Sequence, residues 1–306
     1  MALNQTNKLV WIVETIYKDR KITFEDLNRK WIDNVDLSGG EEMLKRTFHK
    51  WKWSIFDTFG LVIECEKAAP YRYYIENVDD MKRGSIENWL LSTYSVSNSL
   101  IESKSIKDRI ILEEIPSGRE YLEPIIDAMK KNRFIHIIHY NYWREDTREH
   151  YLMPLCVKLF RQRWYMVGRT WPAGKDILFS LDRIRDFHLS SHSFEFPEDF
   201  SPEEYFDGCF GIIPDKNCKV EDVLLKVSAG QANYLRDLPM MQGDNQKEVE
   251  RNDEYSIFKL RVRPSFDFQQ ELLWNREELE VLEPLWLRKE IAGAVKRMWN
   301  KYKEDK

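Results

Sequence analysis

RWYMVGR, residues 163–169, is built mainly from aromatic and apolar side chains, as buried β-strands are. Four further stretches of similar make-up lie around it: FIHIIHYNY (134–142), LMPLCVKLF (152–160), ILFSLDRI (177–184) and FHLSSHSFEF (187–196). Polar turns separate them, and each is short enough to be a single strand. Several short strands at such close spacing predict a small, strongly bent β-barrel.

Strand parity divides residues 163–169 between two faces of the predicted sheet. One face takes Arg163, Tyr165 and Arg169, and the other takes Trp164, Met166 and Gly168. We expect Trp164 to fill the barrel core and Tyr165 to join an arginine-lined face. Guanidinium groups bind phosphate through paired hydrogen bonds, and aromatic rings stack on bases, so such a face suits an anionic ligand. Core packing is the alternative for Tyr165.

The wider sequence resembles the WYL domain over roughly residues 120–195. The matching motifs, in order, are Ile138-His139-Tyr140, Arg148, Pro154-Leu155, Arg163–Gly168 and Phe179–Ile184. The triplet that names the family is Trp-Tyr-Met here, a change that conserves volume and that we expect to leave the fold intact. The resemblance implies an Sm-like or SH3-like barrel that binds nucleic acid or nucleotide-like signals through a cationic, aromatic groove.

The predicted ligand-binding residues combine this resemblance with strand parity. They are Tyr140, Arg148, Arg163, Tyr165, Arg169 and Arg183. Arg183 matches the family's arginine, which favours a ligand role over a simple ion pair with Asp182 or another carboxylate. His139 is a further candidate for the groove, with a surface or core histidine as the alternative. The expected effector is a phosphate-bearing molecule, either a nucleotide or a short single-stranded nucleic acid.

The first 78 residues contain three helical patterns and a hairpin pattern. The predicted elements are a helix at 5–17, a helix at 24–31, a helix that begins at Glu41 and is ended by Phe59-Gly60, and strands at 61–65 and 71–75. Thr23 is expected to cap the second helix, with Asp26 as the acid of a capping box. Three helices followed by a hairpin predict a winged helix-turn-helix, whose third helix enters the DNA major groove.

The third predicted helix carries a basic stripe beside an apolar one. Residues 43–52 contain four Lys or Arg side chains and no acid, although the whole chain has a net charge of −5. We expect DNA contacts from Lys45, Arg46, Thr47, His49, Lys50 and Lys52. The alternative is that these side chains form the solvated face of an ordinary helix.

A second resemblance concerns the same helix. Arg46-Thr47-Phe48 followed by Lys50 resembles the Arg-Thr-Ile-x-Arg-Asp run of DeoR-like and WYL-type regulators. The sequence departs from that pattern at His49-Lys50-Trp51, where Arg-Asp is commoner, so a base preference does not transfer. The resemblance implies a double-stranded DNA operator and a homodimer, because two-fold pairing suits palindromic half-sites.

The remaining segments flank the central domain. Residues 79–119 are expected to form a helical linker, with a helix at 85–101 and a turn at Pro116-Ser117-Gly118. Residues 196–306 begin with a tether and continue in β-α-β-α-β-α order, which predicts a small α+β unit. That unit resembles the C-terminal extension of WYL proteins, which implies a ferredoxin-like arrangement. The predicted fold class is therefore α+β and multidomain, with domains 1–78, 120–195 and 196–306.

Composition excludes several classes of protein. A net charge of −5 with a pI near 5.8 argues against a protein coated in basic charge, so DNA contacts must be local. No apolar stretch approaches the ~18 residues of a membrane span, and the N-terminal run lacks a signal-peptide pattern. We therefore expect a soluble, cytoplasmic protein. The four cysteines form no CxxC pair, which indicates neither a zinc ribbon nor a disulfide framework.

Catalytic and metal-binding patterns are missing from the sequence. His136 and His139 point to opposite faces of a predicted strand, and His188 and His192 lie roughly 13 Å apart along another, so neither pair predicts a metal site. The sequence has no P-loop, GxGxxG, HExxH or GxSxG motif. We expect no enzyme activity, metal or cofactor. The expected function is DNA-binding transcription regulation. The alternative is an accessory nucleic-acid-binding protein that modulates a partner nuclease or a defence system.

Overall fold

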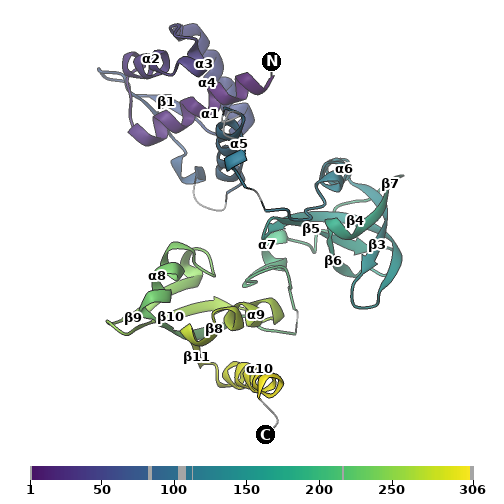
Figure 1. Cartoon of the computed structure of the whole chain (residues 1–306). Helices are drawn as coiled ribbons and strands as arrows, with labels where there is room; N and C mark the ends of the chain where they lie inside the picture. Colours follow the sequence, from purple (N-terminus) through teal and green to yellow (C-terminus); the bar gives the residue numbers. More distant parts are fainter. Residues whose placement is uncertain (1, 82–84, 103–107, 112, 216, 304–306) are drawn as a thin grey trace. The chain divides into compact units, whose positions relative to one another are not determined.

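Figure 1 shows a computed structural model of the chain, which describes residues 2–81, 85–102, 108–111, 113–215 and 217–303. The fold is mixed α/β, with a helical N-terminal region and, within the described residues, three antiparallel sheets of two, five and four strands. The chain divides into two compact units, Met1–Glu113 and Glu114–Lys306. None of the described helices is both long enough and apolar enough to cross a bilayer.

The N-terminal unit is largely helical. Its elements are α1 (Ala2–Asp19), α2 (Phe24–Asp33), α3 (Val35–Ser38), α4 (Lys45–Phe59), β1 (Ile63–Cys65), β2 (Tyr73–Ile75), a 3-10 turn η1 (Val78–Met81) and α5 (Ile86–Glu102). Thr23 caps α2 by accepting a hydrogen bond from the Asp26 N–H, as predicted. Ile22 forms a two-hydrogen-bond bridge with Tyr73, so the segment before α2 extends the hairpin. The predicted linker includes residues 82–84, 103–107 and 112, which lie outside the described residues.

The helix predicted from Glu41 begins later than expected, although it ends at Phe59-Gly60 as predicted. Lys45 is its first residue, and Leu44, expected on the apolar face, is the exposed N-cap. Met43 explains the difference, because its side chain is buried in the core and its N–H donates to Asn28 Oδ1 at 2.7 Å, which holds the segment before the helix extended. The predicted loop contains the one-turn helix α3, which Asn34 caps by accepting the Leu37 N–H.

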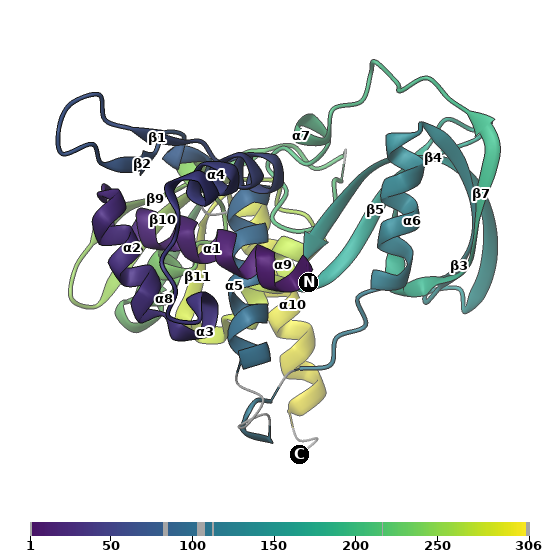
Figure 2. The same ribbon diagram turned by 90° about the horizontal axis from the view of Figure 1, so that it is seen from above.

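The centre of the chain forms the five-stranded sheet. Its elements are α6 (Arg119–Lys130), β3 (Arg133–Asn141), β4 (Asp146–Phe160), β5 (Arg163–Thr170), β6 (Asp176–Ser180), a 3-10 turn η3 (Leu181–Arg183) and β7 (Ile184–Ser193). The strand order is β6-β5-β4-β3-β7, so every strand predicted here is present. Helix α6 packs across β3, β4 and β7 (Figure 2), and Ile125, Ile135, Leu152 and Phe179 form the core between them.

Both faces of β5 are covered, which the sequence did not lead us to expect. Met166 is fully buried on the α6 side, and Trp164 lies half-buried at the margin of the same core. The opposite face carries Val167 and Tyr165, which are also buried. The segment after β7, which includes the short helix α7 (Pro202–Tyr205), supplies the cover there through Phe200. Tyr165 is therefore more deeply buried than Trp164.

Gly118 makes a close backbone approach to η3. It has φ +65°, and a Cβ added to it would lie 2.3 Å from the carbonyl carbon of Leu181 and 2.4 Å from the amide nitrogen of Asp182. The preceding residue, Ser117, accepts a hydrogen bond from the Trp164 N–H. The end of the predicted linker is thus part of the central domain, and glycine is required where it touches η3.

The C-terminal part contains β8 (Glu221–Ser228), α8 (Ala229–Asp237), β9 (Gln246–Arg251), β10 (Tyr255–Val262), α9 (Phe266–Trp274), a 3-10 turn η5 (Arg276–Glu278), β11 (Leu279–Glu283) and α10 (Leu285–Tyr302). The sheet order is β11-β8-β10-β9. Strand β9 was missed because it is a charged edge strand, exposed along almost its whole length, and has no apolar alternation. With β9 the order of elements becomes β-α-β-β-α-β.

Candidate functional site

Helix α4 presents the predicted DNA-binding residues in two ways. Lys45, Arg46, His49 and Lys50 are exposed, whereas Thr47 and Lys52 are half-buried. Lys45 lies 3.6 Å from Glu25 and over the Phe24 ring, and Lys52 lies over the Tyr73 ring of the hairpin. Within the described residues, neither Arg46 nor Lys50 takes part in an ion pair. Their charges are therefore available to a ligand outside the helix.

The second half of α4 has an apolar surface that the sequence analysis did not single out. Trp53 is 75% exposed and Phe56 is 51% exposed. Together with His49, Lys52 and residues 61–64 they line a groove of about 260 Å³ beside β1. The signal was present in the sequence, since His49, Lys52, Trp53 and Phe56 follow one another at helical spacing.

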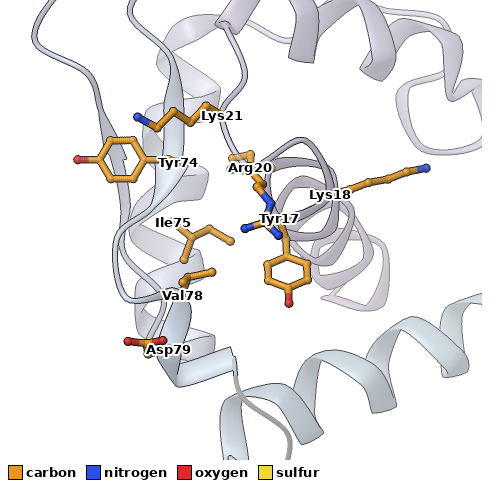
Figure 3. Close-up of a pocket in the computed structure, with 9 residues that line it drawn as sticks. Tyr17, Lys18, Arg20, Lys21, Tyr74, Ile75, Val78 and Asp79 are labelled. Atoms are coloured by element: carbon orange, nitrogen blue, oxygen red, sulfur yellow. The ribbon is translucent and has the colours of Figure 1, made fainter. Parts of the chain in front are cut away.

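A different pocket of about 660 Å³ lies at the end of α1, against β2 and η1 (Figure 3). Ile16 and Ile75 are its buried lining residues, and the Arg20 guanidinium lies between Tyr17 and Ile75. Lys18 also contributes to its lining, but its amine points away. None of the lining residues belongs to α4. Basic side chains of this pocket can therefore be replaced as a control for replacements on α4.

In the central domain, arginine and tyrosine side chains gather around η3. Arg163 donates to the carboxylate of Asp182, whose side chain is 4% exposed and also accepts from Ser180 Oγ. The Arg183 guanidinium lies 4.4 Å from the centroid of the Tyr142 ring. Burial raises the pKa of Tyr165, which also lies in the field of Arg163, Asp182 and Arg183. Its phenol therefore keeps its proton at neutral pH.

Two donors in this cluster lack a partner. Among the described residues, the buried Nε–H groups of Arg163 and Arg183 have no acceptor to which they donate a hydrogen bond. A buried N–H without a partner is costly, and an anionic group that reaches such a donor would satisfy it. The cluster of Arg163, Tyr165, Asp182, Arg183 and Tyr142, which we call the η3 cluster, is thus suited to binding a phosphate or carboxylate.

The remaining predicted ligand-binding residues lie elsewhere. Arg169 is held by Asp176 at 2.7 Å and by Asp199 of the segment after β7, also at 2.7 Å. Arg148 is paired with Asp146 at 3.0 Å. The Tyr140 ring lies beside the Arg185 guanidinium, at 5.6 Å, and beside the Tyr142 ring. Strand parity placed Arg169 correctly on the face of Tyr165 but could not show that carboxylates occupy it.

Tyr142 and Arg185 were missed by sequence reasoning. Tyr142 follows Tyr140 by two residues in the stretch predicted as a strand, which is the spacing of residues on one face. Arg183 lies in η3 and Arg185 in β7, so strand parity does not relate these two residues. The side chains form a chain of contacts from Arg183 through Tyr142 and Tyr140 to Arg185. The period of two from Tyr140 to Tyr142 was the available signal.

His139 lies inside the domain beside the η3 cluster. Its Nε2 is 3.2 Å from the carbonyl oxygen of Ser180, and its ring packs edge-on against Phe179. Burial lowers the pKa of His139 to about 4 from its ordinary value of 6.5, and burial also lowers the pKa of His150 nearby. Both rings are therefore neutral at pH 7. No group of three or more potential metal ligands is arranged to hold an ion within the described residues.

We expect the central domain to lose stability as the pH falls from 7 to 5. The folded state resists protonation of His139 while the unfolded chain takes up a proton below pH 6.5, so the free energy of unfolding falls as the pH approaches 4. Because the His139 ring is partly exposed and solvent screens its charge, the free energy of unfolding should fall by about 1 kcal/mol between pH 7 and pH 5. Urea unfolding at both pH values should show a smaller pH effect in His139→Gln, and an equal effect would contradict this assignment.

Comparison with protein families gives two matches. A WYL domain model matches residues 120–189, and a WCX domain model matches residues 219–299. A search of the curated proteins gives no match. Among solved structures, Proteasome accessory factor B/C (PafBC) of Arthrobacter aurescens is similar with 16% identity and a TM-score of 0.38, covering 96% of this chain and 46% of that chain. The chain thus spans less than half the length of PafBC.

A second solved structure, described as a CRISPR Cas-related protein, is similar with 11% identity and a TM-score of 0.39, covering 98% of this chain and 85% of that chain. The two family matches coincide with the five-stranded sheet and with the segment from β8 to α10. The family predicted from the motifs around Arg163 and Arg183 is thereby confirmed: the chain is a WYL-domain protein, in which a WCX domain follows the WYL domain.

Proposed function

We propose that the chain is a DNA-binding transcription regulator whose WYL domain senses a phosphate-bearing ligand. The observation that carries the DNA-binding part is the exposed face of α4, where Arg46 and Lys50 have no ion-pair partner within the described residues of a chain with a net charge of −5. Such a local concentration of positive charge attracts phosphates even when the whole protein is acidic.

The surroundings of α4 support the same proposal. Helices α1, α2 and α4 are followed by the β1–β2 hairpin, and Ile22 pairs with Tyr73 of that hairpin. This is the arrangement expected of a winged helix-turn-helix, with α4 as the recognition helix and the hairpin as the wing. We assign the five-stranded sheet as an Sm-like barrel and the C-terminal unit as ferredoxin-like on the same basis of order and topology.

The proposal is tested by gel shifts on duplex DNA from upstream of the protein's own coding sequence. A regulator should form a sequence-specific complex that weakens as the salt concentration rises, whereas a scrambled duplex of equal length should bind far more weakly. Equal binding to both duplexes would instead favour an accessory nucleic-acid-binding protein, and absence of binding would contradict the proposal.

The ligand-sensing part rests on the η3 cluster. Arg183 has a tyrosine beneath its guanidinium and an unsatisfied buried Nε, and Arg163 is paired with the adjacent residue, Asp182. A nucleotide would place its phosphate on the arginines and its base against the exposed Tyr142 ring. Ligand binding that alters operator affinity would do so through a coupling of about 1–3 kcal/mol.

We expect Arg183→Ala to weaken nucleotide or oligonucleotide binding by about 10- to 100-fold, since a charge-assisted hydrogen bond contributes about 1.5–3 kcal/mol. Calorimetry on the full chain, with mononucleotides and short single-stranded oligonucleotides at two salt concentrations, measures this. Arg148→Ala is the matched control, because Arg148 is exposed and already paired with Asp146. Equal binding by the wild type and by Arg183→Ala would remove the η3 cluster from the mechanism.

A further inference from the structure

Helix α4 carries an exposed tryptophan beyond the two cations proposed to bind DNA. We propose that Trp53 contacts the C5 methyl group of a thymine in the major groove, so that α4 selects a T·A pair at that position. This inference rests on the proposed function, because it concerns the recognition helix of a DNA-binding protein. It goes further by assigning an apolar, base-selective contact to a helix whose other proposed contacts are polar.

Helix α4 has apolar side chains on two sides. Phe48, Ile55 and Phe59 are buried and hold the helix on the core of the N-terminal unit. Trp53 and Phe56 lie outside this buried stripe, and they are 75% and 51% exposed. A helix needs only one apolar side to pack on its own domain. The second apolar side of α4 is therefore free to contact a ligand.

Trp53 lies on the same side of α4 as the two cations without an ion pair. It follows Lys50 by three residues and Arg46 by seven, and both spacings place side chains on one face of a helix. A rise of about 1.5 Å per residue places Trp53 about 10 Å beyond Arg46 along the helix axis, which is roughly three base-pair steps of DNA. A recognition helix with Arg46 at one base pair thus brings the indole to another pair of the same site.

The surroundings of Trp53 are basic. Residues 43–56 contain four Lys or Arg side chains and no acid. The groove of about 260 Å³ that Trp53 lines beside β1 has two basic residues in its lining, His49 and Lys52, and one acidic residue, Glu64. A surface that combines free cations with an exposed aromatic ring is suited to a ligand that offers anionic and apolar groups together.

DNA offers both groups at the distances that α4 requires. Its phosphates attract the cations, and the apolar group that its base edges present in the major groove is the thymine methyl. An apolar protein partner in the same place would cover Trp53 and Phe56 but would leave Arg46 and Lys50 without counter-charge. The flat indole ring has a large apolar surface, which suits it to cover a methyl group.

The experiment replaces thymine by uracil, which pairs with adenine in the same way and lacks only the C5 methyl group. Operator duplexes with one thymine replaced at a time are titrated with the full chain by fluorescence anisotropy, at one fixed salt concentration. For the wild type, replacement of the contacted thymine should raise the Kd by about fourfold, which is the effect expected for one buried methyl group.

Trp53→Ala should remove this dependence on the methyl group. Its Kd for the native operator should rise by about four- to tenfold, and it should bind the thymine and uracil duplexes equally well. Because Trp53 is exposed, circular dichroism should show an unchanged thermal midpoint. Tyr17→Ala is the matched control, since Tyr17 is an exposed aromatic residue of the same unit that lies on α1. It should keep the fourfold ratio.

A structural role for Trp53 would weaken binding to both duplexes alike and keep the ratio between them, and that result would overturn the proposal. A wild type that tolerates uracil at every position would overturn it as well. In both cases a sequence-specific complex still forms, so the DNA-binding proposal would stand. A wild type that forms no sequence-specific complex would contradict both proposals.

Discussion

Gly118→Ala should destabilise the unit formed by residues 114–306 by about 4 kcal/mol or more. A Cβ at this position would lie 2.3 Å from Leu181 C and 2.4 Å from Asp182 N, and both are backbone atoms that cannot rotate away. The positive φ adds a further cost for any L-residue with a side chain. Thermal unfolding should show a midpoint lower by roughly 10 °C for a unit of this size.

Gly174→Ala is the matched control for this prediction. Gly174 has nearly the same φ, +64°, but a Cβ added to it meets nothing within 4 Å. Its replacement should therefore cost only the conformational part, about 1–2 kcal/mol. If the two variants unfolded at the same temperature, the contact between Gly118 and η3 would not be a real constraint on the fold.

The second large effect is expected at α4. Arg46→Ala combined with Lys50→Ala should raise the dissociation constant for the operator by about 100-fold, because each base or phosphate contact is worth about 1–3 kcal/mol. Both side chains are exposed, so the thermal midpoint should not change. Titration of a labelled operator by fluorescence anisotropy at one fixed salt concentration gives the ratio directly.

The control variant also loses two positive charges from the N-terminal unit, but at positions outside α4. Lys18→Ala with Arg20→Ala takes two cations from the pocket shown in Figure 3, which shares no residue with α4. We expect operator binding by this variant to stay within about threefold of the wild type, since its charges act only at long range. Equal losses in both double variants would show that general charge, rather than the face of α4, governs binding.

The sequence was sufficient where periodicity and turns were unambiguous. All five central strands were predicted because aromatic and β-branched runs alternate with polar turns, and Thr23 was predicted as a cap because Asp26 follows it at the correct spacing. Strand β9 was not predicted, because an edge strand exposed on both faces has no hydrophobic pattern. The start of α4 was misplaced because Met43 is buried through a contact with Asn28, distant in sequence.

The candidate ligand site illustrates a different limit. Parity correctly grouped Arg163 with Tyr165 on one face, and the family motif indicated Arg183. Which arginines can bind a ligand depends on which of them the fold pairs with a carboxylate. Asp182, 19 residues away in sequence, pairs with Arg163, and Asp199, 30 residues away, pairs with Arg169. Such long-range pairing cannot be read from strand periodicity, and it separates Arg169 from the η3 cluster.

The cover on the outer face of β5 determines how this protein can be dissected. A fragment limited to residues 120–189, the extent of the family match, would omit Ser117 and Gly118 at one end and Asp199 and Phe200 at the other. Without Ser117 and Gly118, Leu181 would lose a backbone contact. Without Asp199 and Phe200, Val167 would be uncovered and Arg169 would keep only Asp176 as its carboxylate partner. The packed central domain is therefore longer than the segment that matches the family, and an excised domain should include both flanking segments.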